Sequence, residues 1–152
     1  MDISSLPSFS AAATSDQQID SAELIGQPLI LYFYPKDSTP GCTRESVEFG
    51  AVYPELQSLG VKIFGISRDS LRSHENFRRK QELPFELISD ADEALCKAFD
   101  VIHEKNMYGR KVMGIARSTF LFDSQGQLVR EWRKLKVPGH VDEVMSAVRE
   151  LV

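Results

Sequence analysis

The chain has 152 residues, 42% of them hydrophobic and 26% charged, a composition typical of one globular domain. Its formal net charge of −4 argues against a nucleic-acid binder, because no basic excess is available to neutralise phosphates. The longest apolar run, residues 28–34, is too short to span a membrane. We expect a single domain over residues 1–152, and a cytoplasmic protein because residues 1–6 lack the pattern of a signal peptide.

The N-terminal half alternates predicted strands and helices. An edge hairpin is expected in residues 9–21, followed by a helical turn. In residues 28–34 the side chains that would point to either face of a strand are apolar, which is typical of a strand buried on both faces. A loop rich in turn-forming residues then leads into a helix that ends at Gly60. Further predicted elements are a strand at 61–67, a helix at 70–81, a strand at 85–89 and a helix at 92–99.

The C-terminal half begins with residues 101–116, for which we predict a long loop whose middle part, residues 103–111, is charged. A hairpin is expected from strands at 118–123 and 128–134, and the last helix carries its apolar residues on one stripe. Right-handed crossovers through the first helices make the central strands parallel, while the hairpin adds antiparallel strands. This order predicts a thioredoxin-like α/β fold, a three-layer α/β/α sandwich with a mixed central sheet.

Cys42 lies where the loop after the buried strand enters a helix. The unpaired N–H groups of a first helical turn favour an anion, and the thiolate is the reactive form of cysteine. Thr39 can direct a hydroxyl at the sulfur or at a bound oxyanion, and Pro35 restricts the loop backbone. An isolated cysteine at such a junction is more often a buried structural thiol, but this combination favours a pocket that stabilises charge as a bond breaks.

Pro35, Thr39 and Cys42 form the pattern Pro-x-x-x-Thr-x-x-Cys, which resembles the active site of peroxiredoxins, closest to the bacterioferritin comigratory protein (peroxiredoxin Q) branch. The similarity continues through residues 65–70, 85–90, 99–101 and 117–121. The resemblance implies a thiol-dependent peroxidase that reduces hydrogen peroxide and organic hydroperoxides without a cofactor. Cys42 would be the nucleophile, and Pro35, Thr39 and Arg117 would complete the peroxide pocket. Glu45, one turn into the helix, would orient Arg117.

The chain departs from its relatives in how an oxidised Cys42 would be recycled. Many relatives carry a second cysteine where this chain has Val47, and others carry it on the next helix, where residues 76–80 contain none. Only Cys96 remains, and we expect it to be a small half-buried core residue. The primary hypothesis is one-cysteine recycling by an external thiol such as thioredoxin, glutaredoxin or a low-molecular-weight thiol. The alternatives are a two-cysteine mechanism in which Cys96 resolves Cys42, and a peroxide-sensing thiol relay.

The three histidines, His74, His103 and His140, are widely separated in the sequence and lack the spacing of metal ligands. We therefore expect no metal site and place each histidine at the surface or at a helix end. No exposed apolar stripe demands an interface, so we expect a monomer.

Overall fold

The computed structural model describes residues 3–152, so Met1 and Asp2 of the predicted domain lie outside the described residues. The strands of its main sheet are β1 (Ser10–Ala13), β2 (Gln17–Asp20), β3 (Leu29–Phe33), β4 (Lys62–Ser67), β5 (Leu87–Ser89), β8 (Ser118–Phe122) and β9 (Leu128–Arg133). The helices are the 3-10 turn η1 (Ser21–Leu24), α1 (Pro40–Ser58), α2 (Leu71–Gln81), α3 (Ala94–Ala98) and α4 (His140–Leu151). No helix among the described residues combines the length and the apolar character needed to cross a membrane.

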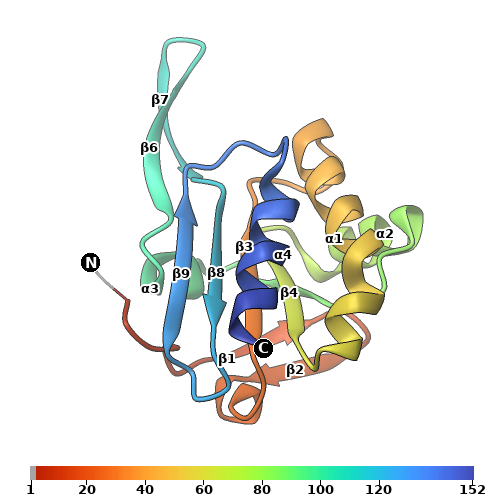
Figure 1. Ribbon diagram of the computed structural model, residues 1–152. Helices are drawn as coiled ribbons and strands as arrows, with labels where there is room; N and C mark the ends of the chain where they lie inside the picture. The colour runs from red at the N-terminus through yellow and green to blue at the C-terminus, as the bar shows by residue number, and fades with distance from the viewer. Residues whose placement is uncertain (1–2) are drawn as a thin grey trace.

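The sheet has seven strands in the order β2-β1-β5-β4-β3-β8-β9 (Figure 1). Strand β3 is parallel to β4 and antiparallel to β8, and β4 is parallel to β5, so the sheet is mixed as predicted. All five residues of β3 are buried. The prediction of a central strand covered on both faces is confirmed.

The two faces of the sheet carry separate cores, because successive side chains of a strand point to opposite sides. On one face Tyr32 packs against Phe49 of α1, and the same core includes side chains of α2 and α4. On the other face Phe33 packs against Phe99 at the end of α3, together with side chains of the N-terminal segment. The crossovers through α1 and α2 run in the same direction along the sheet, which puts both helices on one face. The three-layer arrangement confirms the predicted architecture.

The predicted long loop at 101–116 is wrong. These residues form a hairpin of β6 (Ile102–Met107) and β7 (Arg110–Ile115), whose turn residues Tyr108 and Gly109 have φ of +54° and +79°. Two consecutive positive φ values suit a tight two-residue hairpin turn, and glycine adopts one of them without strain. The hairpin projects from the body (Figure 1), and the first four residues of β7 are exposed. A strand exposed on both faces shows no alternation of apolar and polar residues, so its sequence reads as a polar loop.

Candidate active site

Cys42 is the third residue of α1, whose first residue is Pro40 and whose N-cap is Thr39. The N–H of Thr43 donates to the Thr39 carbonyl at 2.9 Å, which opens the hydrogen-bond ladder of the helix. The N–H groups of Gly41 and Cys42 therefore have no acceptor within the helix, and the positive end of the helix dipole lies at the sulfur. The Cys42 residue is 1% exposed, so its thiol lies beneath the surface.

Arg117, immediately before β8, reaches the first turn of α1. Its Nη2 donates to Cys42 Sγ at 3.3 Å, and its Nη1 donates to Glu45 Oε1 at 2.8 Å. One planar guanidinium thus bridges the thiol and a carboxylate, the geometry for which arginine is better suited than lysine. The structure brings together Cys42, Glu45 and Arg117, as the sequence led us to expect.

Gly41 is a part of this arrangement that the sequence analysis missed. A Cβ at this position would lie 3.1 Å from Arg117 Nη2, closer than most real Cβ contacts. The missing side chain lets the guanidinium approach the start of the helix. A glycine immediately before a nucleophilic cysteine could have pointed to such a close approach.

Glu45 and His140 form a buried polar layer behind Arg117. Burial raises the pKa of Glu45 to about 7, against the lowering effect of the Arg117 charge. Glu45 Oε2 has no hydrogen-bond partner among residues 3–152, and it lies 4.0 Å from His140 Nε2. Burial, with the charge of Arg117, lowers the pKa of His140 to about 4, so this imidazole is neutral at neutral pH. His140 begins α4, as expected of a helix-end histidine, but it is buried.

Pro35 and Thr39 lie between β3 and α1, and we call residues 35–41 the active-site loop. The Thr39 hydroxyl donates to the Lys36 carbonyl at 2.8 Å. Its proton is therefore engaged, while its oxygen lone pairs can still accept a hydrogen bond. Pro35 follows the buried Tyr34 and is itself half-buried.

The second cysteine, Cys96, lies on α3 in the core on the opposite face of the sheet from Cys42. It is 0% exposed, and so more deeply buried than the half-buried position that we expected. Burial, together with the neighbouring carboxylate of Asp90, raises the pKa of the Cys96 thiol well above its usual range. Both cysteines are free thiols, and the structure does not bring them together.

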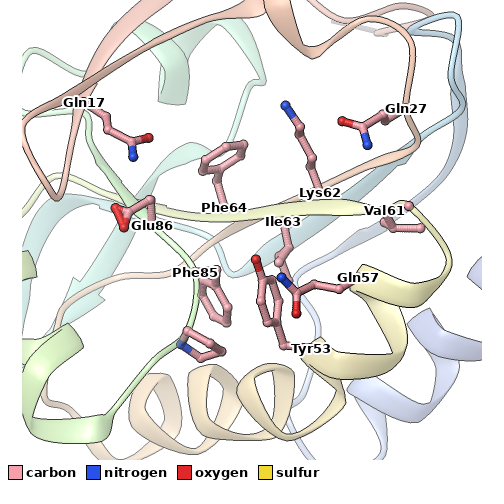
Figure 2. A pocket seen from close by; sticks show the side chains of 12 residues that line it. Gln17, Gln27, Tyr53, Gln57, Val61, Lys62, Ile63, Phe64, Phe85 and Glu86 are labelled. Carbon is pink, nitrogen blue, oxygen red and sulfur yellow. The ribbon is translucent and has the colours of Figure 1, made fainter.

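A cavity of about 480 Å³ (Figure 2) has no Cys42 in its lining. Its lining includes Tyr53 and Gln57 from the C-terminal part of α1, with Lys62 and Glu86 beyond them. A helix rises about 1.5 Å per residue, so Tyr53 lies roughly 16 Å along α1 from Cys42. This cavity is therefore not the pocket of the thiol.

Three residues in or beside the active-site loop have the chemistry of metal ligands. Asp37, Asp69 and His74 each offer one ligand atom, and these atoms lie within 4.8 Å of one another. They are already engaged: His74 Nδ1 is 2.7 Å from Asp37 Oδ2, and Asp69 Oδ2 accepts the Ser67 hydroxyl at 2.6 Å. His74 is the fourth residue of α2, near its beginning, but it is 0% exposed, so of the two expected positions the surface one is wrong. The group is a closed hydrogen-bonded network rather than an open coordination site.

Comparisons with known proteins agree with this geometry. Residues 4–131 match the AhpC/TSA family. Peroxiredoxin Bcp of Xanthomonas campestris is 60% identical over 124 residues, which cover 82% of this chain and 78% of the relative. One solved structure is that of the bacterioferritin comigratory protein of the same species, which was studied for its alkyl peroxide reduction activity. It aligns with a TM-score of 0.89 and 52% identity, over 93% of this chain and 90% of that chain. A PrxQ cysteine-to-serine variant from Xylella fastidiosa aligns with a TM-score of 0.93 and 41% identity over 99% and 96% of the two chains.

Proposed function

The chain belongs to the AhpC/TSA family and is a thiol-dependent peroxidase similar to the Bcp peroxiredoxins, and from this premise we propose how its residues carry out the reaction. The observation that carries the proposal is the guanidinium of Arg117, which contacts both Cys42 Sγ and Glu45 Oε1. A fixed positive charge at the sulfur favours the thiolate, which is the nucleophilic form.

In the oxidation step, the Cys42 thiolate attacks one oxygen of the hydroperoxide. A sulfur–oxygen bond forms, the oxygen–oxygen bond breaks, and the leaving alkoxide takes up a proton to become an alcohol or, from hydrogen peroxide, water. Arg117 stabilises the negative charge as it moves from sulfur to oxygen. The Thr39 hydroxyl, which donates to the Lys36 carbonyl, accepts a hydrogen bond from the peroxide O–H and so orients it. Pro35 keeps the loop in the shape that admits the peroxide.

Glu45 acts on this step through Arg117 rather than on the peroxide. It is 0% exposed and holds Arg117 Nη1, so the position of the guanidinium follows from that of the carboxylate. Glu45 is therefore a positioning residue. By the same chemistry, the substrates are hydrogen peroxide and organic hydroperoxides, in keeping with the alkyl peroxide reduction studied in the Xanthomonas protein.

For recycling we propose a one-cysteine mechanism. The oxidised Cys42 is a sulfenic acid, and the sulfur of an external thiol attacks it, releasing water and leaving a mixed disulfide. A second thiol then breaks that disulfide and restores Cys42. The position of Cys96 across the sheet and its strongly protonated thiol both weigh against its acting as the attacking group. Thioredoxin, glutaredoxin and low-molecular-weight thiols all supply the required chemistry.

We also propose that the protein works as a monomer in the cytoplasm. A thiol-dependent cycle needs a reducing compartment. The exposed large apolar side chains are dispersed over several elements, which supports a monomer; they are Ile25, Val47, Leu71, Tyr108, Val112, Met113, Val129 and Val152. Sedimentation over a range of protein concentrations would show a constant mass if this is correct.

Steady-state peroxide consumption with thioredoxin or dithiothreitol tests the function. Cys42→Ser is expected to be inactive, and Cys96→Ser, the matched control, is expected to turn over like the wild type. Equal consumption by wild type and Cys42→Ser would disprove the assignment. A single turnover that no thiol can repeat would favour the relay instead.

Mass spectrometry after one equivalent of peroxide, without reductant, tests the recycling route. We expect a sulfenic acid at Cys42 that a sulfenate-trapping reagent captures. An intramolecular disulfide between Cys42 and Cys96 as the major product would overturn the one-cysteine mechanism.

A further inference from the structure

A buried carboxylate ties the active-site loop to its surroundings. Asp37 lies in this loop, and its Oδ1 accepts the Tyr34 hydroxyl at 2.6 Å. Its Oδ2 accepts the Ser73 hydroxyl at 2.8 Å and lies 2.7 Å from His74 Nδ1. Its backbone N–H donates to Asp69 Oδ2 at 2.8 Å. One loop residue is therefore held by Tyr34 immediately after β3, by α2 and by the segment that follows β4.

The surroundings of His74 decide where its protons are. The Nε2 atom lies 2.9 Å from the carbonyl oxygen of Ile88, which can only accept, so Nε2 carries a proton. The Nδ1 atom faces the Asp37 carboxylate, whose two oxygens already accept from Tyr34 and Ser73. An ionised carboxylate can only accept, so with Asp37 ionised Nδ1 must donate as well, and the pair is then an imidazolium with a carboxylate.

The other ionisable groups around the pair fit this assignment. Burial, with the nearby negative charges, raises the pKa of Tyr34 well above its usual range, so its hydroxyl keeps its proton and donates. Asp69 is satisfied by the Ser67 hydroxyl and by the Asp37 N–H. The side chains of His74 and Asp37 are 0% and 2% exposed. Water therefore does not screen the pair, and the loss of either charge would leave the other unpaired in the interior.

We propose that the Asp37–His74 ion pair is a positioning device for peroxide reduction, which holds the active-site loop in the shape that Cys42 needs. This inference rests on the proposed function. The pair fixes the loop that carries Pro35 and Thr39 and leads into the first turn of α1, so the geometry of the peroxide pocket depends on it. Removing either member of the pair would leave a buried polar group without its partner, and the loop would loosen.

The same pair has the opposite effect on recycling. Cys42 is 1% exposed, so a folded protein thiol cannot reach its sulfur unless the active-site loop moves. A small hydroperoxide needs no such movement. The ion pair therefore favours the reaction with peroxide and opposes the reaction with a protein thiol.

Asp37→Asn is the most informative variant. The asparagine can still accept from Tyr34 and can donate its amide N–H to Nδ1 of a neutral His74, so a hydrogen bond is kept while both charges are removed. We expect its rate constant with hydrogen peroxide to fall about tenfold at pH 7. We expect amide hydrogen exchange in residues 36–42 to quicken, and oxidised Cys42 to be reduced faster by thioredoxin. Imidazole nitrogen NMR at pH 7 should show a proton on both ring nitrogens of His74 in the wild type and on Nε2 alone in Asp37→Asn.

Two further variants keep the test decisive. Tyr34→Phe removes one donor from Asp37 and a longer contact of 3.4 Å to His74 Nδ1 while it keeps both charged groups, so it should shift each rate in the same direction by a smaller factor. Ser89→Ala is the matched control, because it removes a hydrogen bond of 2.7 Å to the Asp69 carbonyl and leaves the pair intact. It should behave like the wild type. If Asp37→Asn does not fold, Tyr34→Phe carries the same comparison.

A neutral His74 at pH 7 in the wild type, or wild-type rates and exchange in Asp37→Asn, would overturn the proposal. Failure of the proposed function would look different. The wild type would then consume no peroxide at all, while the NMR and hydrogen-exchange results, which need no turnover, would still report on the ion pair.

Discussion

Replacing Arg117 with lysine keeps a positive charge near Cys42 but removes the forked guanidinium that contacts both Cys42 and Glu45. The guanidinium donates to Cys42 Sγ at 3.3 Å and to Glu45 Oε1 at 2.8 Å, whereas a lysine ammonium is a point charge that cannot keep both contacts in place. A hydrogen bond to a charged group contributes about 1.5–3 kcal/mol. Because about 1.4 kcal/mol corresponds to a tenfold change in rate, kcat/KM for hydrogen peroxide should fall about 10- to 100-fold.

The same substitution affects stability through Glu45. This carboxyl is 0% exposed, and removing the partner of a buried charge costs about 3–5 kcal/mol when no charge replaces it. Because lysine retains a positive charge nearby, we expect the free energy of unfolding to decrease by less than this amount. Adding Glu45→Gln to Arg117→Lys should recover part of the stability but none of the rate. Urea unfolding and stopped-flow oxidation of Cys42 measure the two quantities separately.

Arg133→Lys is the matched control. Arg133 also donates through both Nη atoms, to the carbonyls of Asp100 at 2.9 Å and Phe99 at 3.0 Å, but it makes no contact with Cys42 that the structure records. Its lysine variant should lose a similar forked arrangement and keep its kcat/KM. If Arg117→Lys keeps full kcat/KM as well, the forked contact is not needed for peroxide reduction and the reasoning is refuted.

Three other substitutions give independent checks. Burial raises the pKa of Glu45 from 4.5 to about 7. Between these two pH values the folded protein binds more protons than the unfolded chain, so the free energy of unfolding falls as the pH rises. The loss over this range is up to about 3 kcal/mol. Glu45→Gln should remove that pH dependence in urea titrations, and an unchanged slope would contradict the assignment. Gly41→Ala would place a methyl group 3.1 Å from Arg117 Nη2. We therefore expect kcat/KM to fall several-fold while Tm stays nearly constant. A variant with wild-type kcat/KM would show that the close approach is not needed. Cys96→Ala should lower the free energy of unfolding by about 1 kcal/mol through lost packing and leave peroxide turnover unchanged, whereas lost turnover would reopen a role for Cys96.

Most of the architecture could be predicted because periodicity reports burial directly. The uniformly apolar stretch that became β3 is short and is followed by Pro35, which favours a strand over a helix, and the apolar spacing that became α1 is that of a helix. The hairpin of β6 and β7 was missed for the same reason: it projects from the body, so no buried face imposed a pattern on its residues.

By itself the sequence determined the chemistry of one contiguous segment. Pro35, Thr39 and Cys42 lie within a few residues of one another, so the end of a strand, a restricted loop and the start of a helix place them together whatever the rest of the chain does.

Only the tertiary structure decided which distant groups meet that segment. It brought Arg117 to Cys42 across 75 positions and put Cys96 in the core on the far side of the sheet. It also enclosed His74 between Asp37 and the Ile88 carbonyl, where the sequence suggested a surface residue. The reason is physical: a residue's own sequence neighbours limit its conformation, but its protonation and its partners depend on which strands and helices pack against it.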